Sequence, residues 1–307
     1  MRIEDDNGIS TLLASPETRL CAGFGFTEGP VWIADDDALI FSDIPGNRAH
    51  RWRPGASDAE VYREPTGWGN GMTLDRAGNV LVCEHGGRRV SRFPYGRPDA
   101  AETVAAAWHT LPLNSPNDLV VHSSGAIYFT DPTYGQDYGG VPRFGKEGQK
   151  PDLDFQGVYR VSPEGRLDVV IRDGFSQPNG LAFSPDESVL YVGDSQERVI
   201  WRYELDDEGT PRNGTLFIDQ RGDAREGLPD GMKVDTEGRL WTTGAGGVSV
   251  HTARGQYLGV FELDEHAANL CFGGDAYSTL FLTASTGVYS VQTSVIGLGP
   301  NTVRAKA

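Results

Sequence analysis

Six short apolar segments in this chain each begin with an acidic or amide residue, and they recur at roughly regular intervals. The separations between successive first residues are 42, 47, 62, 51 and 39 residues. The first residues are Glu28, Asn70, Asn117, Asn179, Asp230 and Asn269. A repeat of about 40 to 50 residues that is built from short strands is typical of a β-propeller, in which each repeat forms one blade.

Within each repeat, turn-forming clusters separate further segments that are rich in β-branched and aromatic residues. Residues 184–187 (SPDE), for example, precede the apolar run 189–192 (VLYV). The last repeat ends after its third strand, whereas about 25 residues precede the first repeat. We therefore predict one all-β domain over residues 1–307, a six-bladed β-propeller. An N-terminal strand around Thr18–Ala22 would complete the last blade and close the ring.

Charge and composition exclude several functions. The net charge of -16 disfavours nucleic acid and anionic membrane surfaces, which would both repel the chain. The first residues lack the basic and apolar parts of a signal peptide, and no apolar run approaches about 18 residues. Cys21, Cys83 and Cys271 lie in or beside apolar runs without metal-ligand spacing. We interpret them as buried apolar residues of a cytoplasmic protein; the oligomeric state is not predicted.

The six repeat residues have a chemistry in common. The first strand of every propeller blade lines the central channel, so these two carboxylates and four amides should form one ring. Such a ring offers oxygen ligands and two negative charges, which suit one divalent cation. Ca²⁺ fits best because it tolerates irregular oxygen shells, Mg²⁺ or Mn²⁺ come next, and Zn²⁺ is less favoured because no His or Cys joins the ring.

A simpler interpretation of the same residues stays open. Asn-Gly, Asp-Gly and Pro-Asn are ordinary turn sequences, so each residue alone could belong to a turn. Glu28 is the exception, since Glu is not a favoured turn residue. The prediction of a metal ring therefore depends on the joint pattern.

A second set of acidic residues follows the first by 14 or 15 positions, where second strands should end. Antiparallel pairing would return these ends to the face that carries the ring. The four acidic members are Asp43, Glu84, Asp131 and Asp194, and turn formation is the alternative explanation for each. We regard Asp131 and Asp194 as the best candidates to orient ligands or accept a proton.

A long insertion over residues 132–156 separates Asp131 from the next predicted strand. By the same geometry it should emerge on the ring face, either as a lid or wall for a substrate or as a surface insertion without a role. Tyr134, Tyr138 and Phe144 are candidates for stacking against a sugar. Among the histidines, only His85 should lie near this mouth, and no serine-nucleophile motif is present.

The chain resembles the gluconolactonase and senescence-marker-protein (regucalcin) family of six-bladed propellers, and bacterial gluconolactonases in particular. The matching segments are residues 27–32 (TEGPVW), 115–119 (SPNDL), 128–132 (YFTDP), 177–183 (QPNGLAF) and 229–232 (PDGM). The resemblance implies that Glu28, Asn179 and Asp230 bind the metal, with Asn117 as a fourth ligand or a substrate contact. Animal members carry an Arg where this chain has Ser115, so the insertion is a candidate to hold the sugar hydroxyls instead.

These features lead to one principal hypothesis, the hydrolysis of a sugar lactone, glucono-1,5-lactone in the first place, to the open acid. The cation would polarise the carbonyl, and Asp230 or Asp131 would accept a proton from the attacking water while Asn117 steers the substrate. A calcium-dependent phosphotriesterase or arylesterase is the alternative enzyme. A non-catalytic calcium- or sugar-binding propeller, or a scaffold for protein partners, is the alternative from other classes.

Overall fold

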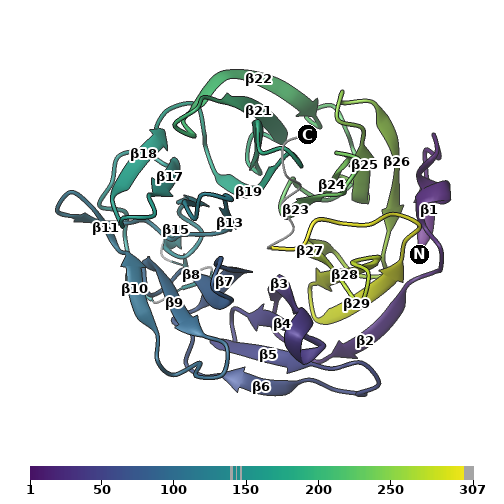
Figure 1. The fold of residues 1–307 in the computed structure, drawn as a ribbon, viewed down its shortest axis with the longest axis horizontal. Coiled ribbons are helices and arrows are strands. Elements are labelled where there is room, and N and C mark those ends of the chain that lie inside the picture. Colours follow the sequence, from purple (N-terminus) through teal and green to yellow (C-terminus); the bar gives the residue numbers. More distant parts are fainter. Residues whose placement is uncertain (139–140, 143, 146, 301–307) are drawn as a thin grey trace.

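Six antiparallel sheets surround a central channel in the computed structural model, which describes residues 1–138, 141–142, 144–145 and 147–300 (Figure 1). Each sheet is one blade, and the chain completes the blades in order around the ring. The predicted fold class, an all-β six-bladed propeller, is confirmed.

The blades are numbered here along the chain, and the strands of each run from the channel outwards. Blades 1 to 3 comprise β3 (Thr27–Ile33), β4 (Ala38–Asp43), β5 (Arg48–Trp52) and β6 (Glu60–Arg63); β7 (Gly69–Leu74), β8 (Asn79–Glu84), β9 (Arg89–Pro94) and β10 (Glu102–Ala105); and β13 (Leu119–Val121), β14 (Ile127–Thr130), β17 (Val158–Val161) and β18 (Leu167–Ile171).

Blades 4 to 6 follow the same plan. They comprise β19 (Pro178–Phe183), β20 (Val189–Asp194), β21 (Val199–Leu205) and β22 (Pro211–Asp219); β23 (Met232–Val234), β24 (Leu240–Gly244), β25 (Gly247–His251) and β26 (Tyr257–Glu262); and β27 (Ala267–Gly273), β28 (Thr279–Ala284) and β29 (Gly287–Gln292). Two short 3-10 helices, η1 (Ile9–Leu12) and η2 (Ala34–Asp36), and two small hairpins complete the described elements. The hairpins pair β11 (Ala107–Trp108) with β12 (Leu111–Pro112), and β15 (Asp137–Tyr138) with β16 (Val141–Pro142).

The N-terminal segment closes the ring, as predicted. Strand β2 (Thr18–Ala22) pairs with β29 and supplies the outer strand of blade 6. An additional strand, β1 (Arg2–Glu4), was not predicted; it pairs with β26 and widens blade 5. The chain start therefore joins the two last blades and gives blade 6 its fourth strand.

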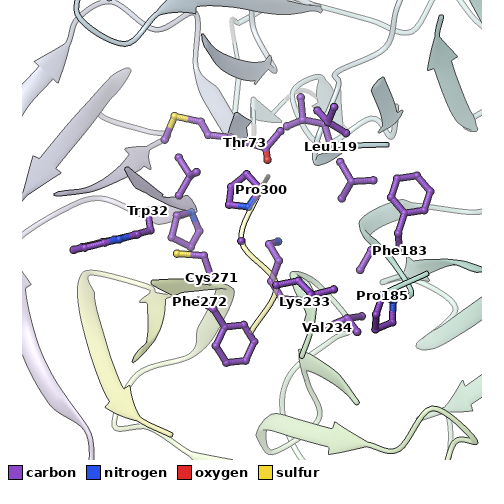
Figure 2. A pocket seen from close by; sticks show the side chains of 18 of the residues that line it. Trp32, Thr73, Leu119, Phe183, Pro185, Lys233, Val234, Cys271, Phe272 and Pro300 are labelled. Atoms are coloured by element: carbon purple, nitrogen blue, oxygen red, sulfur yellow. The ribbon is translucent and has the colours of Figure 1, made fainter. Parts of the chain in front are cut away.

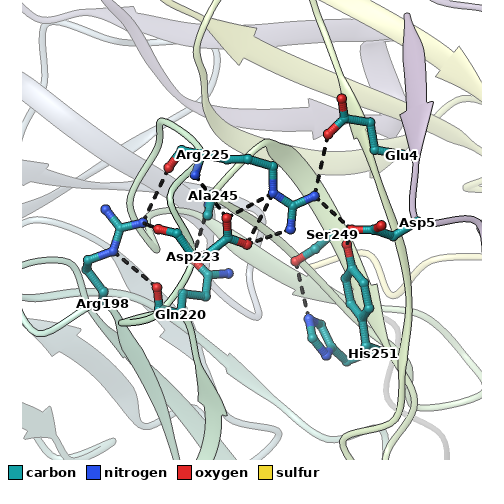
Figure 3. A network of polar contacts seen from close by, with 10 residues as sticks. Glu4, Asp5, Arg198, Gln220, Asp223, Arg225, Ala245, Ser249 and His251 are labelled. Carbon is teal, nitrogen blue, oxygen red and sulfur yellow. Dashed lines mark hydrogen bonds and ion pairs between the residues drawn. The ribbon is translucent and has the colours of Figure 1, made fainter.

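A network of charged side chains fixes this N-terminal segment to the loop that leads into blade 5 (Figure 3). Arg225 forms a bidentate pair with Asp223 and also contacts Asp5 at 3.0 Å and Glu4 at 3.6 Å. Arg198 from blade 4 donates to the Asp223 carbonyl at 3.0 Å. Because this loop ends just before Asp230, ring closure and the position of a predicted site residue are mechanically connected.

Apolar side chains fill the space between neighbouring blades. Trp241 of blade 5 packs edge-to-face on Phe272 of blade 6, with ring centroids 5.7 Å apart, and both side chains are buried. The three cysteines are also buried and unpaired, which agrees with their predicted role as apolar packing residues. Among the described residues, none of the helices has the length and apolar character that a membrane crossing would need.

Candidate functional site

The six repeat residues lie at one end of the channel, at or just before the start of each innermost strand. Four of them coincide with β-bulges, because the pairing register shifts beside Glu28, Asn70, Asn179 and Asn269. Asn117 and Asp230 lie two residues before the starts of β13 and β23. A bulge re-aims the side chain that it carries, which explains how residues of paired strands point towards the axis. The alternative of ordinary turns does not hold for these four positions.

The glycine that follows a ring residue allows the backbones of neighbouring blades to lie close together. A Cβ atom on Gly29 would lie 2.1 Å from the Asn70 carbonyl oxygen, and one on Gly180 would lie 2.0 Å from the Asp230 carbonyl oxygen. Gly71 and Gly231 are confined in the same way by blades 3 and 6. In blades 1, 2, 4 and 5 the backbone therefore packs directly against the ring residue of the next blade, so the Asn-Gly and Asp-Gly pairs indicate close packing here rather than turns.

Asp118 occupies the position that Gly holds in four of the other blades, and the sequence analysis missed it. Its side chain is buried, and Oδ1 accepts a hydrogen bond from the Leu119 amide at 2.8 Å. Oδ2 lies 3.5 Å from the Asn269 amide nitrogen. A comparison of the residues that follow the ring positions would have revealed this exception, because an Asp at a position where four other blades have Gly indicates a specific role.

Asn269 connects two carboxylates instead of offering an oxygen to the channel. Its Nδ2 donates to Glu28 Oε2 at 2.9 Å and faces Asp118 at 3.5 Å, while its Oδ1 accepts from the Leu270 amide at 2.8 Å. The expectation of six inward oxygens is therefore wrong at this position. Asn269 holds Glu28 and Asp118 beside each other on the axis.

Three carboxylates from blades 1, 3 and 5 converge in this mouth. Burial raises the pKa of Glu28 to about 7, and the charge of Asp118 adds to that rise. The pKa of Asp230 lies well above its ordinary value because of burial and the charges of Glu28 and Asp118, although Asn179 partly offsets the shift by hydrogen bonding. Without a cation these groups repel one another, so the mouth favours positive charge.

Asn70 and Asn179 share an arrangement that leaves an amide oxygen unused. The Nδ2 of Asn179 donates to Ser195 Oγ at 2.9 Å, and the Nδ2 of Asn70 lies 3.1 Å from His85 Nε2. The Oδ1 atom of each amide is buried and accepts no hydrogen bond from the described residues. Both oxygens are available as ligands or as acceptors for a substrate.

The acidic residues of the second set fall into two groups that differ in their contacts. Asp43 and Asp194 accept backbone N–H groups of their own loops, and Glu84 pairs with Arg89 at 2.7 Å and Arg63 at 3.3 Å. Their contacts are those of turn and strand supports. Asp131 is completely buried, and burial raises its pKa to about 7.

Asp131 supports the loop that leads to Asn117. Its Oδ2 accepts from the Asn114 amide at 2.8 Å, whereas Oδ1 has no hydrogen-bond partner among the described residues. The electrostatic neighbours of Asp230 are Glu28 and Asp118, not Asp131. The structure thus brings Glu28, Asp118, Asn179 and Asp230 together and places Asp131 behind Asn114. Asn117 is buried in the ring, and its carbonyl accepts from the Gly71 amide at 2.9 Å.

The described part of the insertion 132–156 extends over the ring mouth and contacts several blades. Ser115 Oγ donates to the Pro132 carbonyl and accepts from the Gly135 amide, at 2.7 and 2.9 Å. Farther along, Phe144 packs on Phe26 of blade 1, with centroids 5.2 Å apart. Ser115, the residue that departs from the animal pattern, therefore anchors the insertion.

Tyr134 is the residue of this insertion that reaches the ring. Its pKa is raised to about 12 chiefly by burial, with a further rise from the charge of Asp230 and partial offsets from hydrogen bonds to Ser195 and Asn179. The insertion thus reaches the ring mouth through Tyr134; its role as a lid or wall for a substrate stays a prediction. The side chain of Tyr138 lies outside the described residues.

The residues of the mouth fit a hard divalent cation. Such an ion would stabilise the charged forms of carboxylates whose pKa values are raised, and it would be a partner for amide oxygens that accept no hydrogen bond from the described residues. Within the described residues, no three His, Cys, Asp or Glu side chains are grouped closely enough to hold an ion alone. Amide oxygens would therefore be needed to complete the shell.

The other end of the channel is apolar (Figure 2). Trp32, Phe183 and Phe272 lie on the later halves of three innermost strands and line a cavity of about 110 Å³. The C-terminal segment enters this mouth, where the Leu298 amide donates to the Val234 carbonyl at 3.1 Å and Pro300 lines the cavity. The cluster of carboxylates and the ring amides lie at the ring end, whereas the charged side chains of Lys233 and Glu187 are among those that line this cavity.

Comparison with known proteins gives consistent results. Residues 26–286 match the family model described as "SMP-30/Gluconolactonase/LRE-like region". A gluconolactonase of Zymomonas mobilis is 34% identical, over 93% of this chain and 83% of the relative. A pentonolactonase of Haloferax volcanii is 30% identical, over 85% of this chain and 81% of the relative.

A solved structure agrees with these relatives. The gluconolactonase XC5397 of Xanthomonas campestris superposes with a TM-score of 0.84 at 32% identity, covering 95% of this chain and 94% of that one. Similarity thus extends over almost the whole propeller, the ring mouth included.

Proposed function

Because this chain belongs to the SMP-30/gluconolactonase/LRE-like family, we propose that it is a metal-dependent hydrolase that opens a sugar lactone, glucono-1,5-lactone in the first place. Lactone hydrolysis is the activity for which its relatives from Zymomonas, Haloferax and Xanthomonas are named. The observation that carries the proposal is the convergence of three carboxylates in one amide-lined mouth, those of the buried Glu28 and Asp118 and of the half-buried Asp230.

Glu28, Asn179 and Asp230 would hold the cation, with Asn117 as a fourth ligand or as a contact to the substrate. Ca²⁺ suits this set because carboxylate and amide oxygens from four different blades make an irregular shell. When bound, such a cation supplies a Lewis acid that polarises a carbonyl group. Asn269 and Asp118 would keep the carboxylate of Glu28 in place, since the amide nitrogen of Asn269 contacts both acidic side chains.

A side chain of the protein would accept the proton of the attacking water and later return it. An oxygen of the Asp230 carboxylate accepts a proton from the attacking water, whose oxygen forms the new bond to the carbonyl carbon. The bond between that carbon and the ring oxygen then breaks, and the proton returns to the ring oxygen as a hydroxyl. Burial and neighbouring charges raise the pKa of Asp230 in the metal-free protein, and a bound cation would lower it again, so the carboxylate would be ionised and able to accept a proton near neutral pH. Tyr134 lies close enough to Asp230 for the charge of the carboxylate to raise its pKa, so it would form part of the wall beside the base.

Asp131 has a different place in this proposal. Its Oδ2 fixes the backbone of Asn114, three residues before Asn117. Replacing it should disturb the presentation of Asn117, whereas direct proton transfer from water is assigned to Asp230. The earlier prediction of Asp131 as proton acceptor is tested in parallel by comparing pH profiles of Asp131→Asn and Asp230→Asn variants.

A pH-indicator assay with sugar lactones tests the function. Activity on glucono-1,5-lactone should disappear with chelator and return when Ca²⁺, Mg²⁺ or Mn²⁺ is added back in turn, which also ranks the metals. Paraoxon and phenyl acetate serve as comparison substrates. Undiminished lactone hydrolysis in excess chelator, after exhaustive dialysis, would contradict the metal requirement, and preference for the ester substrates would favour the alternative enzyme.

A further inference from the structure

His85 is buried between the ring and the insertion. Its Nδ1 lies 3.1 Å from the carbonyl oxygen of Phe144, and its Nε2 lies 3.1 Å from Nδ2 of Asn70. The side chain is 1% exposed. A Cβ atom on Gly135 would lie 2.6 Å from the Cβ of His85, so the insertion packs tightly against this residue. His85 thus connects two elements that are far apart in the sequence.

The contacts of His85 define its tautomer. A carbonyl oxygen only accepts hydrogen bonds, so Nδ1 must carry the proton that it donates to Phe144. Burial lowers the pKa of His85 to about 4, which keeps the ring neutral at neutral pH. In a neutral imidazole the other nitrogen is an acceptor, and Nε2 therefore accepts from Asn70.

The tautomer in turn fixes the amide of Asn70. Only its NH₂ group can donate to Nε2, so the two ends of the amide are not interchangeable. The Oδ1 atom must occupy the opposite side, where it is buried without a partner among the described residues. Buried acceptors are normally hydrogen-bonded, and one that is held in place without a partner indicates a ligand.

Asn70 belongs to blade 2, between blade 1, which carries Glu28, and blade 3, which carries Asn117, and it lies three blades away from Asp230. What distinguishes Asn70 from the residues assigned to the cation is the contact of its amide with His85. The insertion anchored by Ser115 covers this side of the mouth through Phe144 and His85. A donor group placed under that cover would meet Asn70 Oδ1.

We propose that Asn70, oriented by His85, is a specificity residue whose Oδ1 accepts a hydrogen bond from a ring hydroxyl group of the sugar lactone. This inference rests on the proposed function and extends it to the recognition of the sugar. Family relatives are named for lactones of different sugars, a gluconolactone and a pentonolactone, so hydroxyl recognition must be local to each chain. His85 is a positioning residue, because it acts only through Asn70.

Binding of D-glucono-1,5-lactam, a lactam of the same ring that resists hydrolysis, tests the proposal by calorimetry in the Ca²⁺-loaded protein. Asn70→Ala should weaken lactam binding about tenfold, which corresponds to about 1.4 kcal/mol. His85→Leu should weaken it at least threefold, because the amide is then free to turn its NH₂ group inward. In the double variant the two losses should not add, since both remove the same acceptor.

His251→Leu is the matched control, because His251 is another buried histidine whose pKa is lowered to about 4, and it lies on the third strand of blade 5. It should change lactam affinity less than twofold. Kinetics give a second readout: Asn70→Ala should raise KM for glucono-1,5-lactone about tenfold, with Ca²⁺ affinity and the rate on δ-valerolactone, which has no hydroxyl groups, within twofold of wild type.

Three results would overturn the inference: unchanged lactam affinity in Asn70→Ala, equal losses on both lactones, or a parallel loss of Ca²⁺ affinity, which would make Asn70 an ion ligand. Failure of the proposed function is a separate outcome. In that case the wild-type protein would bind the lactam through Asn70 but hydrolyse no lactone at all.

Discussion

The two ends of the channel are built from the same six strands and differ in almost every physical property. At the ring end, bulges turn Glu28 and its equivalents towards the axis, and buried carboxylates have raised pKa values. At the opposite end, regular strand continuations present Trp32 and Phe272 to a cavity that the C-terminal segment enters. The symmetric scaffold thus separates a polar, reactive mouth from an apolar, structural one.

Lys233 lies between the two ends of the channel, so the electrostatics of the ring end depend partly on a residue of the opposite end. It lines the apolar cavity, and its Nζ donates to the Met232 carbonyl at 3.0 Å. Its positive charge nevertheless lowers the pKa values of Glu28 and Asp118, which partly offsets the effect of burial. A half-buried cation near a cluster of carboxylates favours their charged forms in the metal-free protein.

The largest effect is expected from removing a carboxylate at the polar mouth. Asp230→Ala should reduce kcat/KM for glucono-1,5-lactone by more than about a hundredfold, because both a cation ligand and the proton acceptor are lost. Glu187→Gln, which alters a carboxylate that borders the apolar cavity, is the matched control and should stay within twofold of wild type. Comparable losses of kcat/KM in both variants would show that the two mouths do not differ in function.

Asp118→Asn should have the next largest effect. The substitution keeps the side-chain size but removes a negative charge and turns an acceptor into a potential donor beside Asn269. Ca²⁺ affinity measured by calorimetry should fall by about tenfold to a hundredfold, as is usual for residues that orient metal ligands. Full affinity would show that Asp118 serves packing alone.

The pH dependence of stability should differ between metal-free and metal-loaded protein. The pKa of Glu28 is raised from 4.5 to about 7, so the metal-free fold favours the protonated form and loses stability as pH rises from 4.5 through 7. Ca²⁺ binds the deprotonated form and reverses this loss.

Scanning calorimetry measures the difference. At pH 8, Ca²⁺ at a hundred times its Kd should add about 2.7 kcal/mol to the free energy of unfolding, and the same concentration should add progressively less as pH falls below 7. A benefit of Ca²⁺ that is equal at pH 5 and pH 8 would contradict the raised pKa values at the polar mouth.

The smallest effect on activity is expected at the apolar mouth. Deleting residues 298–307 removes the hydrogen bond from Leu298 to Val234 and part of the cavity lining, which should cost about 1 to 2 kcal/mol of stability in chemical unfolding. The kcat/KM should stay within twofold of wild type. A tenfold loss of activity without a loss of stability would show that the two mouths are coupled, with Lys233 as the candidate connection.

Sequence periodicity was sufficient for the fold because propeller blades repeat one local pattern. The six apolar segments, the turn clusters and the missing outer strand of the last repeat led to six blades and to closure by Thr18–Ala22, which pairs with β29. The same periodicity located the ring residues. It did not predict β1, because three residues with a weak strand pattern gain their stability from the neighbouring β26.

Individual roles within the ring needed three-dimensional contacts. Asn70, Asn179 and Asn269 look alike in the sequence, yet the Oδ1 atoms of the first two have no hydrogen-bond partner in the part of the chain that the structure describes, and the third directs Nδ2 to Glu28 and Asp118. An amide has a donor end and an acceptor end, and its orientation depends on neighbours from other blades. Asp118 was overlooked for the same reason, since its importance comes from what it faces.

The amino-acid sequence by itself determined the number of blades, their order and the chemical type of the six ring positions, because these follow from local strand and turn preferences repeated along the chain. Only the tertiary structure decided which oxygens are free, which carboxylates share an amide and how the insertion reaches His85 and Asn70. Hydrogen-bond direction and mutual burial are properties of atoms brought together by folding, and no local pattern records them.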